Sequence, residues 1–174
     1  MNNQAAENQV SHGASPFEDA SCPRLRADSF LNGAERLVGM GFRCWISGYQ
    51  TCDIRYWENG WNLFARELGP EQAKAVVTEL TGWARSICCH AERQISVCPL
   101  SKGDFCRDEC IAVSLIAACQ HKSCPALQAC ATALLGVTPA EPVVQTSTRF
   151  AHALDAVQVS LPGNAICYRH DVAN

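Results

Sequence analysis

The 174-residue sequence lacks the features that define several large classes of protein. No stretch reaches the roughly 18 consecutive apolar residues that a membrane-spanning helix requires. Lys and Arg number 14 against 17 Asp and Glu, so no basic excess is available to attract nucleic acid. We therefore expect no membrane span and no nucleic-acid partner.

Motifs of the common catalytic and nucleotide-binding sites are also missing. The sequence has no Gly-rich phosphate loop, no His-Glu-x-x-His and no Gly-x-Ser-x-Gly. No group of residues supplies a nucleophile, a base and a stabilising donor together. The sequence therefore does not predict an enzyme.

A signal for export is not readable in residues 1–21, which contain neither a basic segment nor an apolar run of about 7–15 residues. The chain nevertheless contains 12 cysteines. A secreted protein would pair them in disulfides, whereas clustered thiols in a reducing cytosol bind metals, react or pack as small apolar groups. We expect a cytoplasmic protein, with export lacking a readable signal as the alternative.

Apolar residues recur at helical spacing and predict an all-α fold. The clearest stripe alternates spacings of three and four residues and consists of Ile54, Trp57, Trp61, Phe64 and Leu68. Asp53 offers an N-cap oxygen to this helix, and Gly69 ends it. Because alternating strands and hairpin turns are missing, we expect a compact bundle of five to six helices.

Similar stripes divide the chain into helices and tails. The segment from Phe105 to about His121 is apolar nearly all round from Ile111 onward, which predicts a central buried helix. Further helices are expected from near Asp28, after Pro70, and from Cys124 to Leu135, with a weaker one around Phe150. We expect a flexible tail over 1–26, a cysteine-rich helical domain over 27–136, and a C-terminal helix with an irregular tail over 137–174 that packs on it.

Several glycines interrupt the first of these stripes: Gly33, Gly39, Gly41 and Gly48. Each costs about 1 kcal/mol relative to Ala within a helix. Alternatively, they let another helix approach closely.

Three cysteines continue apolar stripes and are expected to be small buried side chains: Cys44, Cys88 and Cys130. The same argument places Trp57, Trp61 and Phe64 in the core. Because Trp is enriched at interfaces, Trp57 and Trp61 are also candidates for a surface that docks a partner.

A first candidate metal group comprises Cys89, His90, Cys98, Cys106 and Cys110. Cys106 and Cys110 stand four apart, which places two sulfurs on one helix face but too far apart for a relaxed disulfide. Zinc or an iron–sulfur cluster could join these residues across the 94–104 loop. However, the chain has no Cys-x-x-Cys, and its intervals match no ferredoxin run.

A second candidate metal group comprises Cys119, His121, Cys124 and Cys130, at the far end of the same expected helix. Thiolates that project from helices also suit copper(I). The neighbouring acids Asp108 and Glu109 are expected to be first-turn charges that complement the helix dipole.

Two functions follow from these patterns. The first is a cysteine-rich helical protein that binds zinc, an iron–sulfur cluster or copper(I) for a structural, sensing or cofactor-handling role. The second is a non-catalytic subunit or adaptor that docks on a larger protein through its aromatic and thiol-rich faces.

Overall fold

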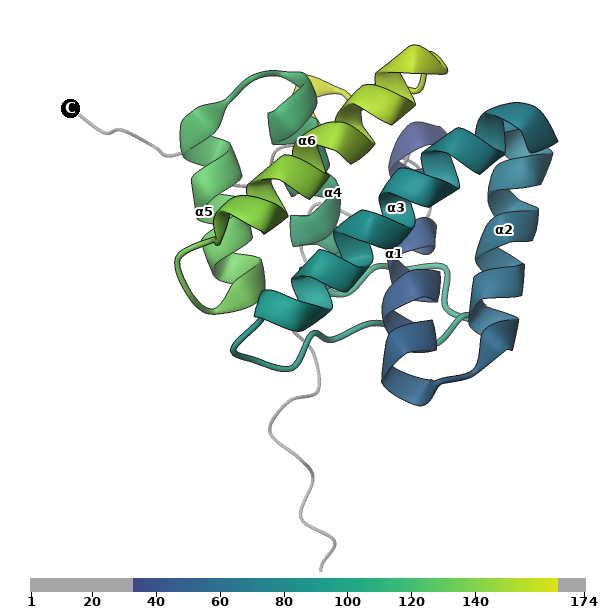
Figure 1. Cartoon of the computed structure of the whole chain (residues 1–174), viewed down its shortest axis with the longest axis horizontal. Coiled ribbons are helices and arrows are strands. Elements are labelled where there is room, and N and C mark those ends of the chain that lie inside the picture. Colours follow the sequence, from purple (N-terminus) through teal and green to yellow (C-terminus); the bar gives the residue numbers. More distant parts are fainter. Residues whose placement is uncertain (1–32, 166–174) are drawn as a thin grey trace, which may run out of the picture.

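The computed structural model describes residues 33–165, which form helices and no strands (Figure 1). The elements are α1 (Gly33–Thr51), α2 (Ile54–Leu68), α3 (Pro70–His90), α4 (Arg107–Gln120), α5 (Cys124–Leu135), α6 (Glu141–Ala156) and the short 3-10 helix η1 (Gly163–Ala165). The expected all-α bundle is therefore confirmed. The expected tail over 1–26 and a helix start near Asp28 lie outside the described residues.

Glycines on α1 and α2 allow these helices to pack closely. A Cβ on Gly41 would collide with the Phe64 ring of α2, and one on Gly48 would collide with the Trp57 indole. Gly60 of α2 likewise makes room for Trp45 of α1. The interruptions in the first stripe therefore serve close helix packing.

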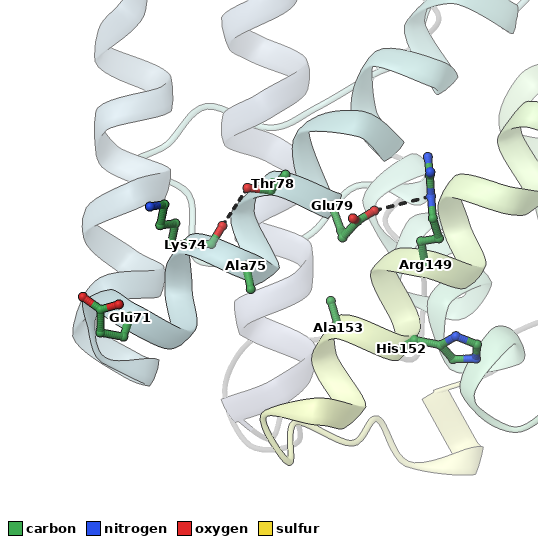
Figure 2. A pocket seen from close by; sticks show the side chains of 8 residues that line it. All are labelled: Glu71, Lys74, Ala75, Thr78, Glu79, Arg149, His152 and Ala153. Carbon is green, nitrogen blue, oxygen red and sulfur yellow. Dashed lines mark hydrogen bonds and ion pairs between the residues drawn. The ribbon is translucent and has the colours of Figure 1, made fainter.

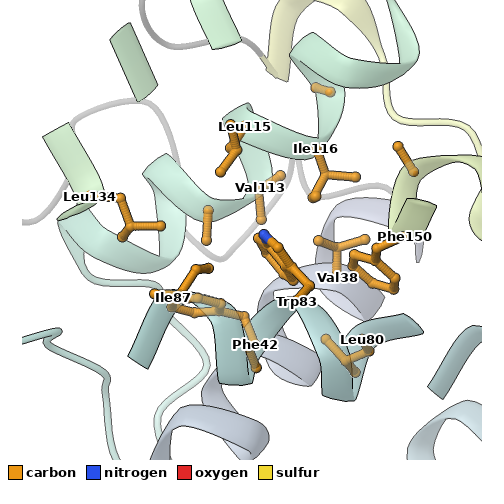
Figure 3. Packing of buried hydrophobic residues seen from close by; sticks show 14 of the residues in the cluster. Val38, Phe42, Leu80, Trp83, Ile87, Val113, Leu115, Ile116, Leu134 and Phe150 are labelled. Atoms are coloured by element: carbon orange, nitrogen blue, oxygen red, sulfur yellow. The ribbon is translucent and has the colours of Figure 1, made fainter. Parts of the chain in front are cut away.

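An aromatic stack joins three helices at the centre of the core. Trp83 of α3 lies between Phe42 of α1 and Phe150 of α6, with ring centroids 5.4 and 5.1 Å away (Figure 3). Aromatic pairs at these separations stabilise a core beyond the area that they bury. Helix α6 is therefore an integral part of the core.

Helix α4 is the central helix that the sequence predicts. Its residues 108–118 are all buried, and it packs against α1, α5, α6 and η1. Figure 1 shows α2 and α5 at opposite ends of the molecule, with α3 and α6 in front. Beyond α6, Leu161 and Ala165 are also buried.

Two expectations about buried side chains are wrong. Trp61 is 36% exposed, because α2 turns Gly60 and Phe64 toward its neighbours and the adjacent position faces outward. Cys88 is exposed as well. The buried stripe of α3 ends at Ile87, and the next residue lies about 100° further around the helix.

Within residues 33–165, no helix combines the length and apolar character that crossing a bilayer requires.

Candidate thiol site at the start of α4

The loop between α3 and α4 is fastened to the bundle by a buried ion pair. Arg43 of α1 and Glu109 of α4 are both fully buried, and Arg43 Nε donates to Glu109 Oε1 over 2.6 Å. A second bond joins Nη2 to Oε2 over 3.1 Å. Such a bidentate pair fixes the guanidinium plane as well as its charge.

The loop folds around the remaining guanidinium hydrogens of Arg43. Nη1 donates to the carbonyl oxygens of Pro99 and Lys102 over 3.2 and 2.6 Å, and Nη2 donates to that of Asp104 over 2.6 Å. The Phe105 ring lies 5.2 Å from the guanidinium carbon and packs against Gly39, where a Cβ would collide with it. Arg43 therefore fixes the path of the loop through three of its backbone carbonyls.

The neighbouring acid, Asp108, holds the first half of the loop. Its carboxylate accepts two hydrogen bonds from Arg93, over 2.9 and 2.6 Å, and a third from the Ser96 amide over 2.8 Å. Asp108 and Glu109 lie in the first turn of α4, as expected. They are in addition buried and bind the loop.

Glu109 also brings two cysteines together. Its Oε1 accepts the Cys98 amide over 3.0 Å, and its Oε2 accepts the Cys106 amide over 2.7 Å. The sulfurs of Cys98 and Cys106 and a carboxylate oxygen of Glu109 all lie within 4.8 Å of one another. Both thiols are free and half-buried. Cys106 is the N-cap of α4, one residue before the helix in which it was expected.

The surroundings keep both thiols protonated at neutral pH. Burial and the negative charge of Glu109 raise the pKa of Cys106 to about 12, although nearby amides that donate to its sulfur oppose this. Burial and Glu109 also raise the pKa of Cys98. The Cys106 thiol donates a hydrogen bond to the Ser96 carbonyl oxygen over 3.2 Å. A partner that binds these sulfurs as thiolates must displace their protons.

Glu109 has little capacity left to bind a cation. Its two oxygens already accept two bonds from Arg43 and one from each cysteine amide, and a carboxylate offers about four lone-pair sites. The donors that remain at this site are two sulfurs.

Of the first metal group, the structure brings only Cys98 and Cys106 together. Cys89 is exposed on α3, and His90 Nδ1 donates to the Ser86 carbonyl oxygen one turn back. Cys110 is buried, with its sulfur 3.9 Å from the Phe105 carbonyl oxygen.

The second metal group is not gathered in the described part of the chain. Cys130 is fully buried, and Cys124 is exposed. His121 Nε2 donates to the Leu161 carbonyl oxygen over 2.8 Å. Within residues 33–165, one group of three Cys, His, Asp or Glu side chains has its ligand atoms within 4.8 Å of one another. It consists of Cys98, Cys106 and Glu109.

Two surface hollows lie away from these thiols. A groove of about 620 Å³ runs between α3 and α6, where Glu79 and Arg149 face each other at 3.5 Å (Figure 2). Charged residues of both signs line it, among them Glu71 and Lys74. A second hollow, of about 440 Å³, is lined by Trp57, Glu58, Trp61 and Asn62 of α2.

Arg43, on which this site depends, was not among the residues predicted from the sequence. The available signal was a charged residue flanked by Phe42 and Cys44 within an apolar stripe. A charge in such a position is almost always paired. Its partner is 66 residues away, which local spacing does not reveal.

Comparisons with protein-family models, with curated proteins and with solved structures give no match. The function must therefore be argued from the chemistry of the chain's own residues.

Proposed function

We propose that this protein binds a thiophilic metal ion, with Cys98 and Cys106 as thiolate ligands. One observation carries the proposal: two free thiols lie within 4.8 Å of each other beside a loop that a buried ion pair holds. Thiolates are the ligands that soft and borderline metal ions prefer. Because the loop is already ordered around Arg43, little conformational entropy opposes binding.

The number of available sulfurs favours copper(I) over the zinc and iron–sulfur sites expected first. An iron–sulfur cluster takes four cysteine thiolates, and a structural zinc ion takes four ligands. The gathered donors are two sulfurs beside a carboxylate that is already saturated. Two thiolates suffice for copper(I), which tolerates low coordination numbers. A reducing compartment, such as the cytoplasm, belongs to this proposal because the thiols must stay reduced.

Anaerobic competition with a chromophoric copper(I) chelator tests the proposal. The intact protein should withdraw close to one copper ion per chain, and a Cys98→Ser/Cys106→Ser variant should withdraw markedly less. Because binding displaces protons from thiols of raised pKa, the apparent affinity should increase between pH 6 and pH 8.

A Cys88→Ser/Cys89→Ser variant is the matched control, since it also removes two thiols, both of them exposed. It should retain the copper. Circular dichroism and thermal melting of each variant separate loss of ligands from loss of fold. Equal copper uptake by the two double variants would contradict the assignment, and zinc uptake to the same stoichiometry would remove the preference for copper.

The adaptor function is a second candidate, and one observation favours it. Ile54 and Trp61 are the large apolar side chains exposed on the described surface, at 62% and 36%, and both belong to α2. Trp61 also lines the hollow on that helix. Exposed Trp residues beside a hollow are typical of the anchor positions in protein interfaces.

Substitutions on α2 test this candidate. Phe64→Ala should lower the free energy of unfolding by about 3–5 kcal/mol because Phe64 is fully buried, whereas Trp61→Ala should lower it much less. A photo-cross-linking residue at position 61 should then form one discrete adduct in cells. The same residue at Gln72, exposed on α3, should not. Equal cross-linking at both positions argues against a docking role.

A further inference from the structure

Cys98 and Cys106 mark the two ends of the loop that encloses the Arg43 guanidinium. The backbone amides of both cysteines donate to the same carboxylate, that of Glu109. Between them, the carbonyls of Pro99, Lys102 and Asp104 already accept hydrogen bonds from Arg43. The loop therefore holds its closed path before any covalent bond joins its ends.

We infer that Cys98 and Cys106 are a redox pair that closes to an intramolecular disulfide on reaction with a low-molecular-weight disulfide such as oxidised glutathione. The two sulfurs lie at most 4.8 Å apart, and a disulfide bond is about 2.05 Å long. The two sulfurs must therefore move toward each other for the bond to form. The Cys106–Ser96 hydrogen bond is given up in the process.

Two other cysteine pairs that lie near each other in the sequence are unsuited to such closure. Cys88 and Cys89 are adjacent on α3, where successive side chains point about 100° apart. Cys106 and Cys110 are separated by one helical turn, and Cys110 is buried. Closure between Cys98 and Cys106 instead joins a residue of the loop to the N-cap of α4.

The chemistry balances in two exchange steps. The thiolate of Cys98 attacks one sulfur of oxidised glutathione, which forms a mixed disulfide and releases one glutathione thiolate. The thiolate of Cys106 then attacks Cys98 Sγ, which forms the protein disulfide and releases the second glutathione thiolate. The two protons lost by the cysteines go to these leaving thiolates, and the two sulfurs of the protein are oxidised as glutathione is reduced.

The roles of the two cysteines follow from their surroundings. Cys98 precedes Pro99 in the loop, whereas Cys106 caps α4 and is held by Ser96. Attack by Cys106 requires that its hydrogen bond to Ser96 be broken first. We therefore assign the first attack to Cys98 and the resolving step to Cys106.

This inference is independent of the proposed metal site, since exchange with glutathione needs no metal. The two states exclude each other, however, because the lone pairs that bind a metal belong to thiolates that the disulfide consumes. Oxidation would therefore release a bound metal.

Peptide mapping in a glutathione redox buffer tests the inference directly. Intact protein is equilibrated with a chelator at several ratios of oxidised to reduced glutathione, quenched with acid, alkylated and digested with trypsin. Lys102 lies between the two cysteines, so cleavage places Cys98 in peptide 94–102 and Cys106 in peptide 103–107. We expect these peptides to become linked, with the loss of one pair of hydrogens, and reversibly on addition of dithiothreitol.

Variants give each step its own readout. Cys106→Ser should accumulate a glutathione adduct on peptide 94–102, whereas Cys88→Ser/Cys89→Ser should still form the 94–102/103–107 link. The oxidised protein should also melt several degrees higher than the reduced protein. Two results overturn the inference. One is alkylation of both peptides at the most oxidising glutathione ratio, and the other is a stable glutathione adduct on Cys98 of the unmodified protein. Because a chelator is present throughout, failure here leaves the copper competition unaffected, and the reverse also holds.

Discussion

Cysteines lie near both ends of α4, but their arrangement differs between the two ends. At the N-terminal end, two carboxylates bind the incoming loop and bring Cys98 and Cys106 within 4.8 Å of each other. At the C-terminal end, thiols are equally numerous, but Cys130 is buried and Cys124 is exposed.

The difference shows that the path of the backbone, rather than the number of cysteines, makes a thiol site. The N-terminal loop returns on itself because Arg43 binds its carbonyl groups. The turn between α4 and α5 spans only residues 121–123, and the cysteines beside it belong to no described group of three ligands within 4.8 Å. Four predictions, from the largest expected effect to the smallest, test this contrast.

Arg43→Met should lower the free energy of unfolding by about 3–5 kcal/mol, because it leaves Glu109 buried without its charged partner. Urea denaturation under reducing conditions measures this loss. The matched control is Arg93→Met, since Arg93 is one-third exposed where it meets Asp108, and a loss of about 1–3 kcal/mol is expected there. Equal losses would mean that Arg43 does not hold the loop more firmly than Arg93.

Gly39→Ala should cost about 1–3 kcal/mol through overpacking, because its Cβ would collide with the Phe105 ring just before Cys106. It should also increase the rate at which iodoacetamide alkylates Cys106. Gly82→Ala on α3 serves as the control. A Cβ there meets no atom within 4 Å, so this substitution should stabilise the protein by about 1 kcal/mol through helix propensity. Stabilisation by both substitutions would argue against tight packing at Phe105.

Raising the pH from 8 to 9.5 should lower stability by a smaller amount. The pKa of Cys106 is raised to about 12 and that of Cys119 to about 11, both chiefly by burial. Below about pH 9 the thiol is protonated in both the folded and the unfolded chain, and its contribution to stability is fully present. Above that pH the unfolded chain loses the proton more readily than the folded chain, so the contribution is lost as the pH rises through the folded pKa. Denaturation curves of Cys106→Ser and Cys119→Ser should each depend less on pH. Unchanged pH dependence in both would refute the assignment to these thiols.

His121→Ala should have the smallest effect, about 0.5–1.5 kcal/mol, because it removes one hydrogen bond to the Leu161 carbonyl. Copper uptake by the protein should not change. A loss of copper here would restore the C-terminal end of α4 as a metal site.

The helices were predictable because their signals are local. Asp53 caps α2 and Gly69 ends it, as the residue types indicate. The buried stripe of α3 and the apolar surface of α4 likewise follow from spacing alone. Spacing does not say which residue at the edge of a stripe is covered, and for this reason Cys88 and Trp61 were placed in the core.

The candidate site was predictable only in part. Cys98 was named because it lies in the expected loop, and Cys106 because it stands four residues before Cys110. Cys89 and His90 were grouped with them because they are near in the sequence. The geometry depends on Arg43 and Glu109, which meet across 66 residues of chain. The sequence around Arg43 does not indicate that Glu109 is its partner, and the sequence around Glu109 does not indicate Arg43.

The enclosure of Arg43 also implies an order of folding. Its loop partners follow it by 56, 59 and 61 residues, so α1 leaves the ribosome well before the carbonyls that bind it. Contacts of such high sequence separation form late, because the entropy of closing the intervening chain must first be overcome. Helices α1–α3 can associate earlier through their own contacts, and the thiol pair is assembled only when α4 docks. The proximity of Cys98 to Cys106 therefore marks completed folding. A dye that binds two neighbouring thiols could be used to follow the formation of this pair over time.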